Sequence, residues 1–226
     1  FIDIKLRKRT ATKKEVQRLQ NKFLNADELK SCLQQLKEIN PRIGLAMEFI
    51  ALTGLRCGEL LALRVQDYYK DKSIININGT IIKSARNGED TQRGTPKNSY
   101  SYRDVIINDR AKYILDSIIL ENKKLASWNS KKYKDKGYIF TTSTGNPFNI
   151  QYINTKLRKI KLADKKISTH IFRHTHISIL SELGLPLKSI MQRVGHNDPK
   201  TTLSIYTHVT NNMNNEMKNK LKALSF

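Results

Sequence analysis

The sequence predicts a mainly helical α+β fold, in which a helical body carries one small three-stranded antiparallel sheet. Apolar residues recur at helical spacing along most of the chain, whereas alternation with period two is concentrated in residues 73–108. The length of 226 residues and the hydrophobic content of 38% suffice for one sizeable core or two small ones. We therefore expect a globular chain with short strands beside its helices.

The first part of the chain is expected to be a basic arm followed by three helices. Residues 5–22 carry eight basic residues and one acidic residue, with little apolar periodicity, which is typical of an arm that lies along phosphates. A capping box that begins at Asn25 opens the first helix. Pro41 opens a mostly apolar helix that stops at Gly54, and residues 55–64 predict a short helix packed behind it.

The middle of the chain predicts the sheet and one further helix. Strands are expected at three places, with a long polar loop before the last of them: residues 73–78, 80–84 and 102–108. Helical spacing returns from Asp109 to Leu125, and a short extended piece and a turn follow. From Asn149 onward the pattern predicts consecutive helices that stop at Gly184 and Gly195.

The charge of the chain indicates a polyanionic partner. Lys and Arg number 41 against 20 Asp and Glu, so the formal net charge is +21. Nucleic acid is the leading candidate, because each phosphate that Lys or Arg neutralises releases a condensed counterion. An acidic membrane surface is less favoured, because no basic amphipathic helix with a bulky apolar face stands out. A basic surface that is merely solvated remains the alternative, also for the basic runs at residues 123–136 and 156–166.

Cysteine content and hydropathy exclude several other classes of protein. The two cysteines, Cys32 and Cys57, are too few for a disulfide framework or a zinc site, and a reducing cytoplasmic setting is the simple interpretation. No apolar run approaches the roughly 20 residues that span a bilayer. The chain begins at Phe1 and has no signal peptide, so we expect a trimmed piece of a longer protein.

All five histidines lie between His170 and His208, and three of them share residues 170–176 with an arginine. On a helix His170, Arg173 and His174 lie on one face, because positions three and four apart are neighbours. Histidines at this spacing can ligate a metal, but no Glu follows His170, no acidic cluster is near, and the arginine would repel a cation. Histidines that are hydrogen-bonded within a polar core are a second interpretation. An anion site is the third, because the fork of an arginine matches phosphate oxygens.

Phosphoryl transfer without a metal would need a second buried cation, because protein groups alone must stabilise the charge of the transition state. Arg56 in "TGLRCGEL" is the candidate, since it opens an otherwise apolar helix and Glu59 could fix its guanidinium from behind. The alternative is an arginine whose head group simply reaches solvent.

Three stretches, "TGLRCGEL", "THIFRHTH" and "VGHNDPKTTLSIYTHV", resemble in this order the signature boxes of the tyrosine recombinases. That family includes phage and conjugative-transposon integrases and Xer-type resolvases, and the resemblance covers residues 22–210. It implies the catalytic-domain fold of these DNA breaking-rejoining enzymes. The implied function is a site-specific recombinase or integrase that cuts and rejoins DNA through a covalent 3′-phosphotyrosine, without metal, cofactor or ATP, and integrates or excises a mobile element.

The resemblance also implies a role for each residue of the boxes. Arg56 and Arg173 would clamp the scissile phosphate, and His196 would support it. Tyr206 would be the nucleophile, and His170 would accept its proton or orient its oxygen.

The general acid would be Lys97, in the loop before the third strand, with Lys83 as the alternative because it also lies near a strand end. The remaining residues that we single out in these boxes are expected to support the site or the packing without contacting DNA: Glu59, His174, His176, His208 and Cys57.

Domain organisation and partners follow from the same resemblance. Residues 1–22 would be an interdomain linker, residues 23–210 the catalytic domain, and residues 211–226 a tail helix that follows a polar break at "THVTNN". That tail would dock on a neighbouring subunit or fold back on its own domain. An N-terminal core-binding domain would lie outside this sequence.

The implied partner is double-stranded DNA that carries attachment or recombination sites. We expect a homotetramer on DNA, a monomer for the isolated domain, further directionality or DNA-bending factors, and a location in the bacterial cytoplasm at the nucleoid, with no membrane partner. Two alternatives remain, a type IB topoisomerase-like enzyme and a catalytically inactive DNA-binding module. The helix after "YTHV" disfavours the first, and the complete set of reactive residues disfavours the second.

Overall fold

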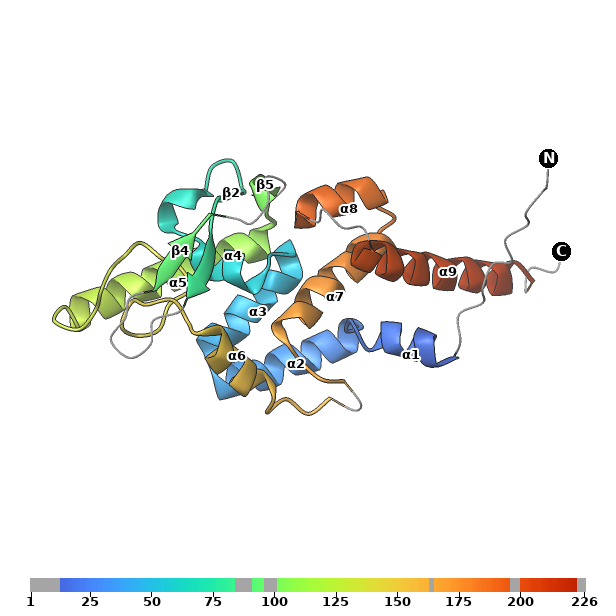
Figure 1. The fold of residues 1–226 in the computed structure, drawn as a ribbon, viewed down its shortest axis with the longest axis horizontal. Helices are drawn as coiled ribbons and strands as arrows, with labels where there is room; N and C mark the ends of the chain where they lie inside the picture. Colours follow the sequence, from blue (N-terminus) through green and yellow to red (C-terminus); the bar gives the residue numbers. More distant parts are fainter. Residues whose placement is uncertain (1–12, 84–90, 96–100, 163–164, 196–199, 223–226) are drawn as a thin grey trace.

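The computed structural model describes residues 13–83, 91–95, 101–162, 165–195 and 200–222, and they form the mainly helical α+β fold that the sequence predicts (Figure 1). The helices described in these ranges are α1 (Lys13–Gln20), α2 (Ala26–Ile39), α3 (Pro41–Thr53), α4 (Cys57–Ala62), α5 (Asp109–Trp128), α6 (Ile150–Leu157), α7 (Thr169–Glu182), α8 (Leu187–Val194) and α9 (Lys200–Lys222). A 3-10 turn, η1 (Val65–Asp67), leads into the first strand. In Figure 1 the strands lie at the end of the molecule that carries α4 and α5, and α9 and α1 lie at the other end.

Helix α3 is the centre of the core, with α2 and α7 packed against it. Its sequence is mostly apolar, with Arg42 and Glu48 as its charged residues, and Ile43, Met47 and Phe49 are fully buried. Asn40 caps its start, and Gly54 ends it in the left-handed conformation with φ 72°. A Cβ at Gly54 would lie 2.5 Å from the ring of His176 on α7, so the missing side chain also permits the close approach of α7.

The three predicted strands are present, but they do not form one sheet. β2 (Ile74–Ile77) pairs on one side with β5 (Arg103–Ile106) and on the other with a two-residue strand that the sequence did not predict, β1 (Tyr68–Tyr69). β3 (Thr80–Lys83) pairs with β4 (Gln92–Gly94), a short strand within the loop that we expected to be irregular, and forms a separate two-stranded sheet. All these pairings are antiparallel.

The C-terminal helices are built on a second, smaller apolar cluster. Its buried members come from α7, α8 and α9: Ile177, Ile190, Val194, Ile205 and Val209. The polar break expected at "THVTNN" is wrong, because α9 runs without interruption from Lys200 to Lys222. Within residues 5–22, α1 is a helix that the sequence did not predict, and it lies against α9.

Candidate active site

Arg56, which the sequence predicts as the second cation of the site, is the N-cap residue of α4 and follows Gly54 by two residues. Its Nη1 lies 2.7 Å from Oε1 of Glu59, and its backbone N–H donates to Oε2 of the same carboxylate at 3.0 Å. The ion pair expected from the three-residue spacing is therefore present. It leaves the Arg56 side chain 36% exposed, so one edge of this guanidinium faces solvent.

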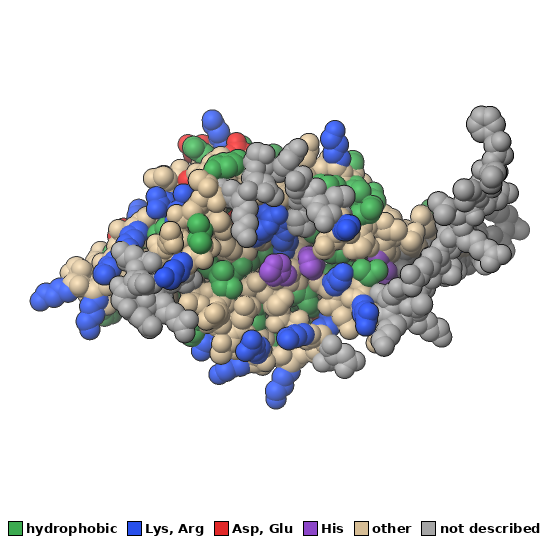
Figure 2. All heavy atoms as spheres, viewed as in Figure 1, with side chains coloured by type: hydrophobic (Ala, Val, Ile, Leu, Met, Phe, Trp, Pro, Cys, Tyr) green, Lys and Arg blue, Asp and Glu red, His purple; other side chains and the backbone are tan. Residues whose placement is uncertain are grey.

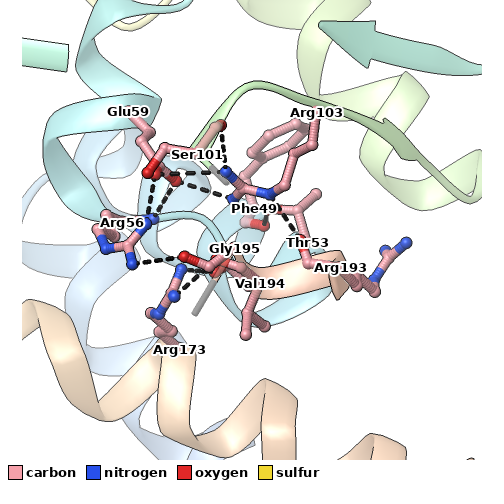
Figure 3. Close-up of polar contacts among 11 residues, drawn as sticks. Phe49, Thr53, Arg56, Glu59, Ser101, Arg103, Arg173, Arg193, Val194 and Gly195 are labelled. Carbon is pink, nitrogen blue, oxygen red and sulfur yellow. Dashed lines mark hydrogen bonds and ion pairs between the residues drawn. The ribbon is translucent and has the colours of Figure 1, made fainter. Parts of the chain in front are cut away.

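Glu59 is shared with a second arginine that sequence analysis did not single out. Arg103, on β5, donates from Nη2 to Oε2 at 2.9 Å and from Nη1 to Oε1 at 3.3 Å (Figure 3). Burial alone would raise the pKa of Glu59, but the hydrogen bonds and charges of Arg103, and then of Arg56, outweigh it, so the pKa lies below its ordinary value. Glu59 is thus an ionised, buried carboxylate between two arginines.

Arg173, the arginine of the predicted anion site, lies on α7 and is 2% exposed. Its Nη1 donates to the carbonyl oxygen of Gly54 at 2.5 Å, and its Nη2 donates to that of Val194 at 2.7 Å. The neighbouring carbonyl oxygen, that of Gly195, accepts from Nη2 of Arg56 at 2.7 Å. The two guanidinium groups therefore converge on the end of α8 (Figure 3).

No carboxylate among the described residues forms an ion pair with Arg173. Burial and the nearby positive charge of Arg56 lower its pKa to about 9, so its guanidinium stays charged at neutral pH. Carbonyl oxygens accept from two of its N–H groups but do not neutralise its charge.

The histidines of α7 occupy three different environments. His170, one turn before Arg173, is exposed, and partial burial together with the charges of Arg173 and Arg56 lowers its pKa. Nδ1 of His174 lies 3.2 Å from the carbonyl oxygen of Lys22, and burial lowers its pKa to about 4. Both are therefore neutral at pH 7. On α9, the ring of His208 lies 6.1 Å from that of Phe23 between centroids.

His176 is buried at 3% exposure and hydrogen-bonded at both ring nitrogens. Its Nδ1 donates to the carbonyl oxygen of Ala51 at 2.8 Å, and its Nε2 accepts from Nε of Arg193 at 3.0 Å. Both contacts require the neutral ring with its proton on Nδ1. Burial, followed by the charge of Arg193, accordingly lowers the pKa of His176 to about 3. Arg193 is a further residue that sequence analysis missed.

The predicted nucleophile and general acid are placed less completely. Tyr206 lies on α9, which packs along α7, and its half-buried side chain lies against the second apolar cluster. Within the described residues, no hydrogen bond joins Tyr206 to Arg56 or Arg173. Lys97 and His196 lie outside the described residues. Lys83, the alternative acid, is exposed at the end of β3.

The described site has a surplus of positive charge. Three guanidinium groups, those of Arg56, Arg103 and Arg173, lie near the buried carboxylate of Glu59, which pairs with the first two. Figure 2 shows histidine and Lys or Arg side chains together in the middle of one face. No group of three or more His, Cys, Asp or Glu side chains in the described part of the chain could hold a metal ion. Such a cluster of fixed cations is suited to bind a phosphate oxyanion.

Comparison of the sequence with known proteins identifies the family of the chain. Residues 22–213 match the model of the phage integrase family. An integrase of Staphylococcus phage L54a is 46% identical over 184 residues, which cover 80% of this chain and 52% of that protein. A probable integrase of prophage ps2 in Lactococcus lactis is 41% identical over 217 residues, which cover 92% of this chain and 56% of that protein. The chain thus spans about half the length of these relatives.

Solved structures show the same fold at lower identity. The integrase of transposon Tn1549, in complex with transposon right end DNA, superposes with a TM-score of 0.67 at 20% identity, over 89% of this chain and 66% of that one. XerA recombinase superposes with a TM-score of 0.63 at 24% identity, over 90% of this chain and 66% of that one. Among the described residues no helix is long and apolar enough to cross a membrane. The family model, the relatives and the shared fold agree with the arginine cluster, and the chain belongs to the phage integrase family.

Proposed function

We propose that the chain is the catalytic part of a site-specific DNA recombinase that cuts and rejoins DNA through a covalent 3′-phosphotyrosine and so integrates or excises a mobile element. The observation that carries this proposal is the convergence of Arg56 and Arg173 on the end of α8, next to one shared carboxylate. Two fixed guanidinium groups, of which that of Arg173 has no neutralising carboxylate among the described residues, are suited to bind the nonbridging oxygens of a phosphodiester. They stabilise the charge that develops as phosphorus is attacked, without reorganisation during the reaction.

The remaining steps use groups of the same chain. Tyr206 attacks phosphorus, and neutral His170 accepts its proton or orients its oxygen, which is consistent with the lowered pKa of His170. Lys97 donates a proton to the leaving 5′ oxygen, a role that the family resemblance supports, and His196 supports the phosphate. The adduct conserves the energy of the phosphodiester, so the 5′ hydroxyl of a partner strand can rejoin the DNA without ATP.

Double-stranded DNA with a recombination site is the proposed substrate. The net charge of +21 favours it, and the similar Tn1549 integrase was solved in complex with transposon right end DNA. We propose residues 23–210 as the catalytic domain, preceded by an interdomain linker and, in the whole protein, by a core-binding domain that completes a clamp on the duplex. The assembly that recombines two sites would be a homotetramer, with directionality or DNA-bending factors, in the cytoplasm at the nucleoid.

Trapping of the covalent intermediate tests the proposal. A duplex with the attachment site of the element and a nick beside the scissile phosphate releases a short strand after cleavage, so the adduct accumulates. The wild type should give a protein–DNA species that survives SDS, and Tyr206→Phe should bind the same duplex with equal affinity and give none. An adduct formed by the Phe variant would exclude Tyr206 as the nucleophile, and absence of an adduct with the wild type would contradict the proposed function.

A further inference from the structure

Three consecutive backbone carbonyls at the end of α8 receive three arginines from three different elements. The carbonyl oxygen of Arg193 accepts from Nε of Arg103 at 2.7 Å. That of Val194 accepts from Nη2 of Arg173 at 2.7 Å, and that of Gly195 from Nη2 of Arg56 at 2.7 Å (Figure 3). The last carbonyls of a helix have no partner within the helix and carry the negative end of its dipole, so they suit cationic donors. The end of α8 thus fixes the spacing of the three guanidinium groups.

Arg103 differs from the other two arginines because it has almost no donor left for a ligand. Its side chain is 8% exposed. Nη1 donates both to Glu59 and to the carbonyl oxygen of Ser101 at 2.9 Å, Nη2 donates to Glu59, and Nε donates to the carbonyl of Arg193. Four of its five N–H groups are therefore engaged within the protein. An arginine in this state holds its neighbours and does not bind phosphate.

We propose that Arg103 is a positioning residue that aims Arg56 at the scissile phosphate, an inference that rests on the proposed function. Each oxygen of Glu59 accepts one hydrogen bond from Arg56 and one from Arg103, so the plane of the carboxylate is fixed by both. Without Arg103, Glu59 would keep only the contacts with Arg56 and could rotate with it. The Arg56 guanidinium would then be held in a fixed position only at the carbonyl oxygen of Gly195, although it would keep its charge.

Arg103 also ties together segments that are distant in sequence. Glu59 lies 44 residues before it and Arg193 lies 90 residues after it. Its bond to the carbonyl of Ser101 holds the chain immediately after the loop that contains Lys97. The same guanidinium therefore sets the position of α4 relative to α8 and anchors one end of the segment that carries the proposed general acid. A small displacement at any of these points is costly, because phosphoryl transfer depends on the geometry of the donors.

A comparison of two substrates separates positioning from general damage to the fold. The nicked duplex is prepared with an ordinary scissile phosphodiester and with a methylphosphonate, in which a methyl group replaces one charged nonbridging oxygen. Arg56 has less charge to stabilise on the methylphosphonate, so a misdirected Arg56 matters less there. We expect Arg103→Met, in the complete enzyme, to slow single-turnover cleavage of the phosphodiester about 10- to 100-fold and that of the methylphosphonate less than about 5-fold. Arg103→Lys keeps the charge but loses the fork, and it should show the same preference more weakly.

The salt dependence of DNA binding is a second measurement, and it distinguishes a positioning role of Arg103 from a direct contact with phosphate. The slope of log affinity against log salt should be the same for Arg103→Met as for the wild type, because in our proposal Arg103 contacts no phosphate. Loss of one phosphate contact would reduce the magnitude of this slope by about 0.9. Arg110→Met is the matched control, because Arg110 also binds a carboxylate with two donors, that of Glu48 at 2.6 and 3.0 Å, but on α5 and outside the cluster. It should cleave both substrates at the wild-type ratio.

The outcomes are distinct. Equal slowing on both substrates by both Arg103 variants, normal cleavage of the phosphodiester, or a reduced salt slope would each overturn the positioning role. If Arg103→Met does not fold, the ratio measured with Arg103→Lys decides the matter alone. Failure of the wild type to form any adduct would instead contradict the proposed function, so the two failures cannot be confused.

Discussion

Acid should destabilise this protein before any carboxylate is protonated, because His176 must stay neutral in the folded state. Its Nε2 accepts a hydrogen bond from Arg193, and its Nδ1 donates to the carbonyl of Ala51. A proton on Nε2 would oppose two N–H donors and place a second positive charge beside the guanidinium. Burial of the ring, and then the charge of Arg193, hold the pKa of His176 at about 3 in the folded protein, against 6.5 for an ordinary histidine.

The sign and size of the effect follow from linkage. Between pH 6.5 and about 3 the unfolded chain binds a proton at this residue and the folded chain does not, so stability is complete above pH 6.5 and falls as the pH falls. One pKa unit corresponds to about 1.4 kcal/mol, so His176 alone should remove about 2 kcal/mol from the free energy of unfolding between pH 7 and pH 5. The pKa values of His170 and His174 are also lowered, so the whole protein should lose more than this.

Urea unfolding at pH 7, 6 and 5 measures the effect, and substitution isolates the part that belongs to His176. His176→Gln keeps a donor and an acceptor but cannot titrate, so its loss between pH 7 and pH 5 should be about 2 kcal/mol smaller than that of the wild type, whatever its stability at pH 7. Arg193→Met removes the neighbouring charge and should also reduce the loss, though burial still acts on the ring. Equal losses in the wild type and His176→Gln would refute the assignment of a neutral His176.

Four further predictions concern the arginine cluster, the chemistry and the tail. Glu59→Gln should lower the free energy of unfolding by about 3–5 kcal/mol, because it leaves the buried guanidinium of Arg103 without its carboxylate. Glu121→Gln, at a half-exposed pair with an arginine, should cost less than about 1 kcal/mol, and similar losses by urea unfolding would contradict this. Cleavage should proceed in EDTA, and a strict Mg²⁺ requirement would refute this. Lys97→Ala should slow cleavage of a normal phosphodiester far more than cleavage of one with a 5′-bridging sulfur, because sulfur leaves without a proton. Equal slowing of both substrates would make Lys83 the next candidate for the general acid. Deletion of residues 211–226 should spare binding to a single site and abolish recombination between two sites, and normal recombination would show that the tail is dispensable.

The sequence predicts well what local rules determine. The limits of α3 follow from Pro41 and Gly54, and the Arg56–Glu59 pair follows from a spacing of three residues at the start of a helix. Strands shorter than four residues carry no recognisable alternation, so the sequence did not predict β1 and β4. Because β4 was not predicted, the sequence also did not show that β3 belongs to a second sheet. The expected break in α9 was wrong because Asn and Thr cost a helix only a few tenths of a kcal/mol each, and neither Gly nor Pro occurs there.

The part of the site that could not be predicted is held by contacts over long sequence distances. Arg103 stands in a strand pattern like any exposed polar residue, and only the pairing of Ile77 with Arg103 in the sheet brings it to Glu59. Arg193 looks like a basic residue in the last turn of a helix, where such residues are common. Its contact with His176 depends on how closely α7 approaches the end of α3 at Gly54. No local pattern records either arrangement.

Continuity of α9 has a mechanical consequence for catalysis. Tyr206 and the exposed Met213 and Met217 lie on one helix, at spacings of seven and four residues, so they share a face. The half of the helix that carries Tyr206 packs on α7 and α8. If Tyr206 is the nucleophile, as we propose, a partner bound to the methionines would act on it through a continuous helix and not through a hinge. The arginine cluster, in contrast, is held by the end of α8 and by Glu59. In the proposed reaction the guanidinium groups would thus be held by contacts within one domain, whereas the position of Tyr206 would depend on that of α9.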